Sequence, residues 1–416
     1  GLALGCEIQP SVFHRKNYFY PDMPKDYQVS QYDQPICING ALDLPNGTRI
    51  GIERAHLEED AGKTTHIGGE DGRIHGASQA LVDYNRAGVP LLEVVSRPDI
   101  RSAEDARAYV EELRAILIAT EASEARLEEG SMRVDANVSV RPFGSDELRT
   151  RCEIKNLNSI RFVMRAIEVE AFRQIEAIED GHRILQETRL FDPERSETRP
   201  MRSKEEAHDY RYFPDPDLLP LRLDAEWVSK LRSELPELPD EKRNRFVRQY
   251  GLSVDDASVL VVEPDRSQFF ESLVQGRDPK QAANWILGEL LGKLNKMNLD
   301  LSEINLSAEQ LGELLDLVSE GAISGRMAKQ VFDEMFETGK TAKVIVEERG
   351  MVQISDTTEI AAYVEQVLSD HGDKVIEYQS GKDKLLGFFV GQIMKETRGK
   401  ANPKVVNDIL LKRLGR

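Results

Sequence analysis

The hydrophobic pattern of the chain changes near residue 225, and this change limits the chain to a small set of architectures. Before this point, short apolar stretches alternate with polar residues and are separated by turns, which is typical of β-strands. After it, apolar residues recur at helical spacing between capping residues and glycines. A run of strands followed by a run of helices predicts an α+β protein with an antiparallel sheet. At 416 residues the chain is too long for one ordinary core, so we expect two to three domains.

The clearest strand is predicted at 133–141. Its odd-numbered residues are polar, and its even-numbered residues, from Val134 to Val140, are apolar. The segment 151–155 alternates in the same way beyond a loop, and we expect it to pair antiparallel with the first strand. Their polar faces, which include Asp135, would then form one surface that mixes cations and anions. The alternative is an ordinary solvent-exposed sheet face.

Helices are predicted in both parts of the chain. In the first part, one helix spans about 103–119 with Ser102 as its N-cap, and another spans about 160–178 and is stopped by Gly181. In the second part, helix starts are marked by Ser307 with Gln310 and by Asp356 with Glu359.

A dense acidic segment at 56–63 (HLEEDAGK) suggests a metal site. Its three successive carboxylates are joined by Glu93, which stands in the middle of an otherwise apolar strand at 89–95. Mg²⁺ takes oxygen ligands from a few carboxylates and shares the rest of its shell with water and substrate phosphates. The pattern therefore predicts a Mg²⁺ site. The alternative for the triplet is a solvated turn, and for His56 we predict a structural role.

Common nucleotide-binding motifs are missing from the sequence. Gly62-Lys63-Thr64 resembles the end of a P-loop, but that motif needs a glycine five residues before Gly62, where the chain has Leu57. The sequence also lacks the patterns GxGxxG, HExxH and GxSxG. A nucleotide would therefore bind to a less common scaffold.

The distribution of charge separates the end of the chain from the rest. The chain has 73 acidic and 55 basic residues, a net charge of −18, which argues against general nucleic-acid binding, and we predict no DNA partner. Residues 387–416, in contrast, carry a net charge of +5. This basic segment predicts local contacts with RNA phosphates, and a solvated helix face is the alternative. The residues proposed for RNA contact are Lys395, Arg398, Lys400 and Lys404.

The compartment is predicted from two simple features. No apolar run approaches the length of a membrane span, so we predict no membrane partner. The three cysteines are widely spaced, which favours reduced thiols over a disulfide framework. These features fit a cytosol or an organelle matrix, and of these we predict a cytoplasmic protein, most simply in a bacterial cytosol.

Several long motifs occur in order along the chain: RKNYFYPDMPKDYQ, HLEEDAGK, NRAGVPLLEVVS, RVDANVSVRP, EIKNLNS, DYRYFPDPDL, GFFVGQIMK and GKANP. In these motifs the chain resembles the B subunits of tRNA-dependent amidotransferases (the GatB family), over essentially its whole length. The resemblance implies three domains: a cradle-like catalytic domain at 1–225, a helical domain at 226–345 and a small helical tRNA-binding tail domain at 346–416.

The resemblance also implies a reaction, that of a carbon–nitrogen ligase with glutamine as amido donor. The B subunit uses ATP and Mg²⁺ to phosphorylate the side-chain carboxylate of Glu-tRNA(Gln), Asp-tRNA(Asn) or both. Ammonia released by the amidase, which is the A subunit, then displaces the phosphate, and the small C subunit completes the heterotrimer. Phosphoryl transfer needs positioning and charge neutralisation rather than a covalent nucleophile, which suits these residues.

Residue roles follow from the same resemblance. It implies the Mg²⁺ ligands Glu59 and Glu93, catalytic residues Lys16, Lys25 and Asp135 along a polar route to that site, and supporting roles for Glu58 and Asp60. Lys16 and Lys25 belong to the aromatic segment 14–27, which its two prolines predict to be a rigid loop.

The start of the chain differs from the family pattern. Members of the family begin with a strand that carries a Glu-Val-His motif, and many then have a Cys-rich zinc cluster; both would lie before Gly1. We therefore expect an N-terminally truncated subunit that is inactive by itself.

Two alternative functions stay open. One is a non-catalytic tRNA-binding scaffold, and the other is a carboxylate–metal nuclease or phosphatase that works without partners. If an intact complex with Glu59→Gln still phosphorylated Glu-tRNA with ATP, the catalytic role expected for these acids would be wrong and the scaffold would be favoured.

Overall fold

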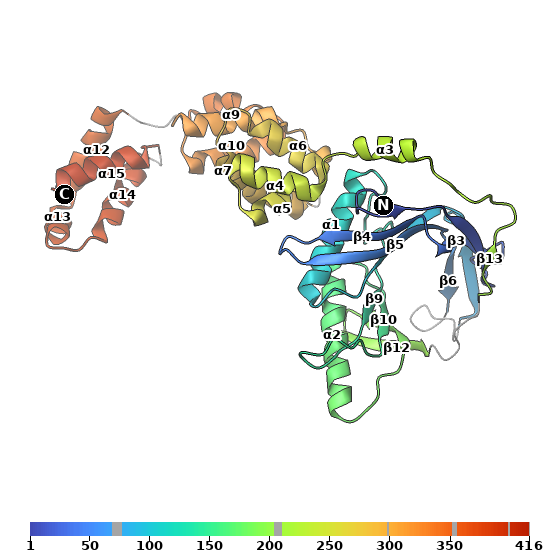
Figure 1. The fold of residues 1–416 in the computed structure, drawn as a ribbon. Coiled ribbons are helices and arrows are strands. Elements are labelled where there is room, and N and C mark those ends of the chain that lie inside the picture. Colours follow the sequence, from blue (N-terminus) through green and yellow to red (C-terminus); the bar gives the residue numbers. More distant parts are fainter. Residues whose placement is uncertain (69–76, 204–209, 298, 352–355, 398–399, 416) are drawn as a thin grey trace. The chain divides into compact units, whose positions relative to one another are not determined.

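A computed structural model describes residues 1–68, 77–203, 210–297, 299–351, 356–397 and 400–415. The chain divides into two compact units, residues 1–244 (unit 1) and residues 245–416 (unit 2). Unit 1 combines sheets with helices and unit 2 is helical, so the predicted α+β class with an antiparallel-sheet region is confirmed (Figure 1). The predicted domain boundaries near residues 225 and 345 stay predictions.

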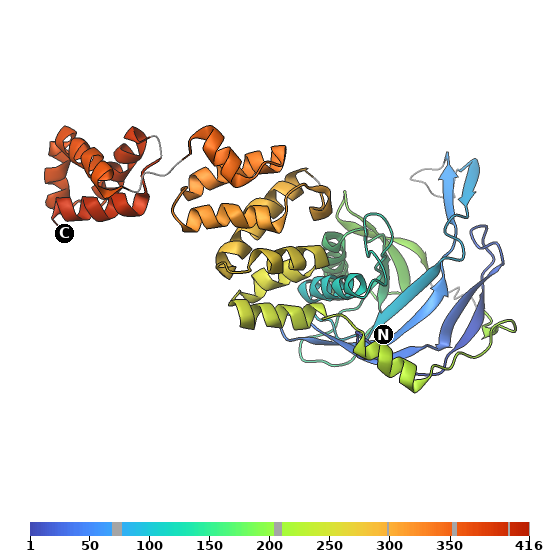
Figure 2. The ribbon, with the colours of Figure 1, turned by 90° about the horizontal axis from the view of Figure 1, so that it is seen from above.

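The larger sheet of unit 1 is antiparallel throughout and is centred on the long strand β5. Its order is β1-β4-β5-β3-β2-β13, and β8 also pairs with β5. The strand bounds are β1 (Glu7–Ile8), β2 (Val12–Asn17), β3 (Tyr27–Gln34), β4 (Cys37–Asp43), β5 (Arg49–Glu59), β8 (Pro90–Ser96) and β13 (Phe213–Pro214). Between β5 and β8, the strands β6 (Lys63–Ile67) and β7 (Gln79–Asp83) form a hairpin that stands away from the larger sheet (Figure 2).

A smaller sheet carries the region predicted as the clearest strand. Its order is β12-β11-β10-β9, formed by β9 (Ala136–Val138), β10 (Cys152–Lys155), β11 (Glu187–Asp192) and β12 (Glu197–Ser203). The predicted antiparallel pairing of β9 with β10 is confirmed, but β9 is much shorter than the predicted 133–141. The reason is that β10 begins at Cys152, opposite Val138, so the residues after Val138 have no partner strand.

Helices α1 (Ala103–Ala119) and α2 (Ile160–Glu179) cover these sheets. Helix α2 packs against β9 and β12, and α1 contacts both α2 and β4 (Figure 1). The predicted N-cap Ser102 is confirmed, because it accepts a hydrogen bond from the amide of Asp105. For α2 the sequence allows Asn158 or Ser159 as the cap, and the structure has Ser159, which accepts a hydrogen bond from the amide of Phe162. The core between helices and sheets includes Ile50, Ile52 and Phe191, which are almost fully buried. Cys6, Cys37 and Cys152 are free and buried.

After β13 the chain is helical. The helices are α3 (Ala225–Ser233), α4 (Pro239–Tyr250), α5 (Val254–Val261), α6 (Pro264–Leu273), α7 (Pro279–Asn284), the π-helical η3 (Trp285–Leu290), α8 (Leu291–Met297), the short 3₁₀ η4 (Leu301–Glu303), α9 (Ala308–Ser319), α10 (Gly325–Thr338), α11 (Ala342–Arg349), α12 (Thr357–Asp370), α13 (Gly372–Gln379), α14 (Leu385–Glu396) and α15 (Pro403–Leu414). One apolar core is built from α4–α11 and another from α12–α15. No helix among the described residues is both long and apolar enough to cross a membrane.

The predicted capping box of α9 is present and provides a test of this helix. Ser307 accepts a hydrogen bond from the amide of Gln310, and the Gln310 side chain accepts one from the amide of Ser307. Replacing Ser307 by Ala leaves one of these helix-end donors unsatisfied, and we expect unit 2 to lose about 1 kcal/mol of stability. Urea denaturation followed by the fluorescence of Trp285, in a chain with Trp227→Phe, would measure the loss. Unchanged stability would show that water replaces the cap at no cost.

Candidate functional site

The acidic segment forms the end of strand β5 and contributes to a cluster of three side chains. His56 and Glu58 are two residues apart in a strand and therefore share one face of the sheet. The neighbouring strand β8 places Glu93 directly opposite His56. One ligand atom from each of the three residues lies within 4.8 Å of those of the other two. We call His56, Glu58 and Glu93 the carboxylate–histidine cluster.

The imidazole of His56 holds the two carboxylates of this cluster together. Its Nε2 lies 3.3 Å from Oε1 of Glu58 and 3.2 Å from Oε2 of Glu93. The side chain of His56 is fully buried, that of Glu58 is 11% exposed and that of Glu93 is 45% exposed. The cluster is thus anchored inside the sheet by His56 and opens to solvent at Glu93.

Glu58 is fixed from the neighbouring strand β3. Its carboxylate accepts a hydrogen bond of 2.8 Å from Oγ of Ser30 and a longer one of 3.3 Å from Nε2 of Gln28. Burial by itself raises the pKa of Glu58, but the hydrogen bonds from His56 and Ser30 and the positive charge of Lys16 outweigh it and lower the pKa. Glu58 is therefore a carboxylate at neutral pH, as a metal ligand must be.

His56 is better suited to orient the carboxylates than to bind the ion itself. Its burial lowers the pKa, and the hydrogen bonds to Glu58 and Glu93 more than offset this and raise it. The other ring nitrogen, Nδ1, is buried without a hydrogen-bond partner among the described residues. An unpartnered N–H would be costly there, so the proton belongs on Nε2, which then donates to the carboxylates.

The donor set fits a hard divalent cation. Two carboxylates from different strands, one of them half-exposed, offer oxygen ligands and leave room for water and substrate phosphates, as Mg²⁺ requires. With these oxygen donors, Glu58 and Glu93 would hold the ion, and His56 would orient their two carboxylates relative to each other.

Glu59 does not join this cluster. It follows Glu58 in β5 and so projects from the other face of the sheet. There its carboxylate lies 2.6 Å from Nζ of Lys25 and accepts a hydrogen bond of 3.1 Å from the amide of Val29. The structure therefore brings together Glu58 and Glu93, where the sequence analysis predicted Glu59 and Glu93. A ligand role for Glu59 stays a prediction.

Lys16 and Lys25 occupy opposite faces of the larger sheet. Lys16 of β2 lies opposite Gln28 of β3, on the face of the cluster, and its Nζ lies 4.9 Å from the ring centroid of Tyr210. Nζ of Lys25 lies 4.7 Å from the centroid of Tyr27 on the other face. The segment 14–27 is thus not simply a loop, because residues 12–17 form strand β2 and only the residues between β2 and β3 connect strands. A continuous polar route through both lysines stays a prediction.

Asp135 and Asp60 lie apart from the cluster. Asp135 precedes β9 in the smaller sheet, where it accepts a hydrogen bond from Lys155, so this cation–anion pair of the predicted polar surface is present. A catalytic role for Asp135 stays a prediction. Asp60 is almost buried and accepts a 2.6 Å hydrogen bond from Arg86, with Arg133 at 3.4 Å. Asp60 therefore joins the larger sheet to the chain that enters β9.

The predicted RNA-binding residues lie at the end of unit 2. Lys395 is exposed in the last turn of α14, Lys404 is exposed in the first turn of α15, and Lys400 stands in the connection between these helices. Arg398 lies outside the described residues. Their roles stay predictions.

Sequence reasoning missed the groups that support Glu58. Ser30 and Gln28 carry no motif of their own, and only the pairing of β3 with β5 brings them to the carboxylate. His56, predicted to be structural, is the residue that joins both carboxylates. Its position two residues before Glu58 was the available signal, because that spacing puts both side chains on one strand face.

Comparisons with known proteins agree with one another. A family model described as the GatB/GatE catalytic domain matches residues 1–229, and a model described as the GatB domain matches residues 268–414. The B subunit of the aspartyl/glutamyl-tRNA(Asn/Gln) amidotransferase of Rhodospirillum rubrum is 53% identical over 419 residues, covering 100% of this chain and 85% of the relative.

Two further relatives come from other bacteria. The B subunit of the same name from Carboxydothermus hydrogenoformans is 51% identical over 420 residues, with 100% of this chain and 86% of the relative covered. The B subunit from Persephonella marina is 52% identical over 415 residues, with 98% of this chain and 86% of the relative covered. The carboxylate–histidine cluster lies within the part of the chain matched by the catalytic-domain model.

Proposed function

The chain belongs to the GatB/GatE family of amidotransferase B subunits, and on this premise we propose that it activates the side-chain carboxylate of Glu-tRNA(Gln), Asp-tRNA(Asn) or both, using ATP. The γ-phosphoryl group of ATP is transferred to a carboxylate oxygen, giving an acyl phosphate and ADP. Ammonia then attacks the acyl carbon, inorganic phosphate leaves and the amide forms. The ammonia comes from glutamine hydrolysed by the amidase of the complex.

The observation that carries this proposal is the carboxylate–histidine cluster in the family's catalytic domain. Two carboxylates that approach each other this closely repel, and here a single imidazole compensates them only in part. A divalent cation held by Glu58 and Glu93 would supply the remaining positive charge and leave room to bind phosphate oxygens. Mg²⁺ would supply charge neutralisation of the transferred phosphoryl group.

The residues around the cluster then have defined tasks. Ser30 and His56 keep the Glu58 carboxylate ionised and fixed in direction. Lys16 adds a positive charge on the same face, where it attracts the negative substrate carboxylate and ATP. Because phosphoryl transfer depends on positioning, this rigid arrangement on strands suits it.

The proposal includes partners and a compartment. We assign the chain to a heterotrimer with the amidase (the A subunit) and the small C subunit, with ATP, Mg²⁺ and misacylated tRNA(Gln) or tRNA(Asn) as ligands. The reaction uses aminoacyl-tRNA before translation, so the cytoplasm is its natural compartment. The names of the relatives support the tRNA substrates and the amidotransferase class.

A direct test is to follow both half-reactions in the heterotrimer assembled with the amidase and the small C subunit. We expect ADP to form only when the misacylated tRNA is present, and Gln-tRNA(Gln) or Asn-tRNA(Asn) to form when glutamine is added. Binding of tRNA with no ADP formation would favour the non-catalytic scaffold. Hydrolysis of RNA or phosphate esters by the chain without its two partners would favour a nuclease or phosphatase.

The basic end of the chain gives a prediction about tRNA affinity. Replacing Lys404 by Ala in the complex removes one exposed cation from α15, and we expect tRNA binding to weaken about 3- to 10-fold, with the slope of log K against log salt reduced by about 1. Filter binding at several salt concentrations would measure both. The same replacement at Lys230, an exposed lysine of α3, serves as the control. An unchanged salt slope for the Lys404 variant would remove this residue from the tRNA contact.

A further inference from the structure

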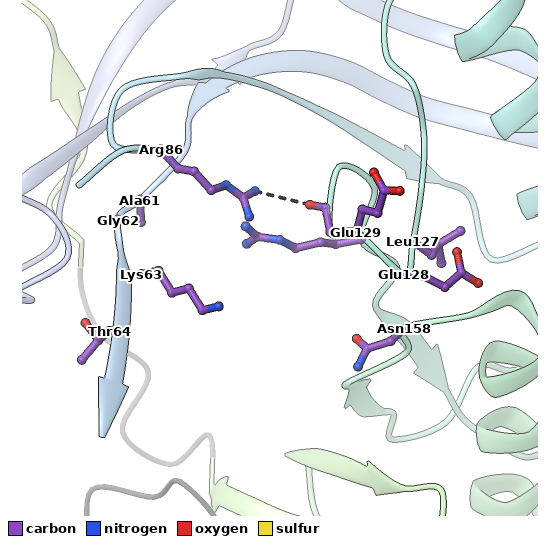
Figure 3. Close-up of a pocket in the computed structure, with 11 residues that line it drawn as sticks. Ala61, Gly62, Lys63, Thr64, Arg86, Leu127, Glu128, Glu129 and Asn158 are labelled. Carbon is purple, nitrogen blue, oxygen red and sulfur yellow. Dashed lines mark hydrogen bonds between the residues drawn. The ribbon is translucent and has the colours of Figure 1, made fainter. Parts of the chain in front are cut away.

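A polar cavity lies beside the end of β5. It has a volume of about 450 Å³ and lies between the start of the β6–β7 hairpin and the loop that precedes β9 (Figure 3). Its charged and polar lining includes Lys63, Arg86, Arg133 and Asn158. We call it the Lys63 cavity. A volume of this size is in the range of small-molecule sites, roughly 300–1,000 Å³.

The two arginines of the Lys63 cavity are held in place but not neutralised. Both donate to one carboxylate, that of the nearly buried Asp60: Nη2 of Arg86 lies 2.6 Å from it and Nη2 of Arg133 lies 3.4 Å from it. A single carboxylate cannot balance two guanidinium groups, so a positive charge remains. Guanidinium groups fixed in this way are well suited to bind phosphate oxygens.

Lys63 adds a second positive charge. Lys63 is exposed and forms no ion pair with an acidic side chain among the described residues, and Figure 3 shows it projecting into the same space as Asn158 from the opposite side. The backbone before Lys63 is tightly held, because a Cβ at Gly62 would lie only 2.7 Å from the carbonyl oxygen of Asp83. Lys63 therefore extends from a fixed point of the chain.

Two acidic residues also line the cavity, and they offset these positive charges only in part. Glu129 forms an ion pair of 2.9 Å with Arg126, and Figure 3 shows the carboxylates of Glu128 and Glu129 on the side away from Lys63. On the same side, Asn158 stands one residue before Ser159, the N-cap of α2, where the helix dipole favours an anion.

We propose that the Lys63 cavity binds a phosphate group of a ligand of this protein, with Lys63, Arg86 and Arg133 as the contacts. It differs from the carboxylate–histidine cluster in both residues and charge, since it is cationic where the cluster is anionic. The cluster ends at Glu58 in β5, and the lining of the cavity begins at Ala61 in the same chain segment. Two sources offer this chemistry: the polyphosphate of a nucleotide and the backbone of an RNA end. The identity of the source rests on the proposed function, but phosphate binding does not.

The test measures binding, not turnover. The full chain is titrated with inorganic tripolyphosphate in one arm and with a short single-stranded RNA in the other, both without Mg²⁺, by isothermal calorimetry. Lys63→Ala is expected to weaken binding about 10-fold for the probe that represents the natural ligand, since it removes a charged contact. Lys63→Arg should retain most of it. Lys230→Ala is the matched control, and thermal melting confirms that each variant is folded.

The outcomes separate the possibilities. Weaker tripolyphosphate binding assigns the cavity to a nucleotide, and weaker RNA binding alone assigns it to the RNA. If Lys63→Ala and Arg133→Lys both bind the two probes like the unchanged chain, or if the unchanged chain binds neither probe, the proposal is overturned. These readouts are independent of ADP formation, so a failure of the proposed reaction would not be mistaken for a failure of this site.

Discussion

Replacing Glu58 by Gln is expected to lower tRNA-dependent ADP formation in the assembled complex by about 100-fold or more, because it removes a charge directed at the site of phosphoryl transfer. The replacement is almost isosteric. It keeps one oxygen that can accept from Ser30 and loses the negative charge that a cation needs. The fold should therefore remain intact while the cation site is lost.

Glu59→Gln is the matched comparison, since the two residues are neighbours in the same strand and are replaced in the same way. Glu59 lies on the other face with Lys25, so we expect a loss well below that of Glu58→Gln. A larger loss for Glu59→Gln than for Glu58→Gln would reverse our assignment. It would restore the pair Glu59 and Glu93 that the resemblance implied.

A second readout separates metal binding from other effects of the Glu58 replacement. Mn²⁺ is a useful probe for a Mg²⁺ site, and its binding to the chain can be followed by electron paramagnetic resonance. We expect Glu58→Gln and Glu93→Gln to weaken Mn²⁺ binding, and Glu59→Gln to leave it nearly unchanged. Full Mn²⁺ affinity in Glu58→Gln together with lost activity would give Glu58 a role other than metal binding.

The sequence predicted elements that depend on local signals. The starts of α1, α2 and α9 were predicted within a residue or so, because capping residues act on neighbouring amides. The pairing of β9 with β10 was also predicted, since both alternate strictly and a loop joins them. What the local pattern could not supply was the length of β9, which depends on where its partner strand begins.

The candidate site depends on contacts that are far apart in sequence, and this limits what the sequence alone predicts. The segment 56–63 and Glu93 were recognised as acidic and as belonging to separate elements. Which of two adjacent glutamates faces Glu93 depends on the β5–β8 register, in which His56 is opposite Glu93. A shift of one residue would have exchanged Glu58 and Glu59, because successive side chains point to opposite faces.

Replacing Glu170 by Ala is expected to destabilise unit 1 by about 3–5 kcal/mol, because it leaves buried cationic and polar partners without their anion. Glu170 of α2 is fully buried. Its carboxylate accepts hydrogen bonds from Arg173 at 2.6 Å, from Gln174 at 2.8 Å and from Thr198 at 2.6 Å, and Arg189 lies 3.3 Å away. One side chain thus joins α2 to β11 and β12.

Hydrogen exchange is the suitable measurement, because the chain has two compact units and a single unfolding transition cannot be assumed. Amides of β10–β12 should exchange faster in Glu170→Ala, while those of α9 and α10 in unit 2 serve as an internal control. Glu176→Ala, an exposed change on the same helix, should alter stability by less than about 0.5 kcal/mol. Equal protection of β10–β12 in both variants would show that the network does not stabilise the smaller sheet.

The stabilisation from Glu170 should also depend on pH in a defined direction. Burial raises the pKa of this carboxyl, but the hydrogen bonds from Arg173, Thr198 and Gln174 outweigh it and hold the pKa below its ordinary value. A lowered pKa means that the folded state binds the proton less readily than the unfolded chain does. The stabilisation is therefore complete above the carboxyl's unfolded pKa, about 4.3, and is lost as the pH falls towards the lower folded value. The difference in stability between the unchanged chain and Glu170→Ala should accordingly be largest near neutral pH and shrink in acid, and a difference that grows in acid would contradict the assignment of a buried carboxylate.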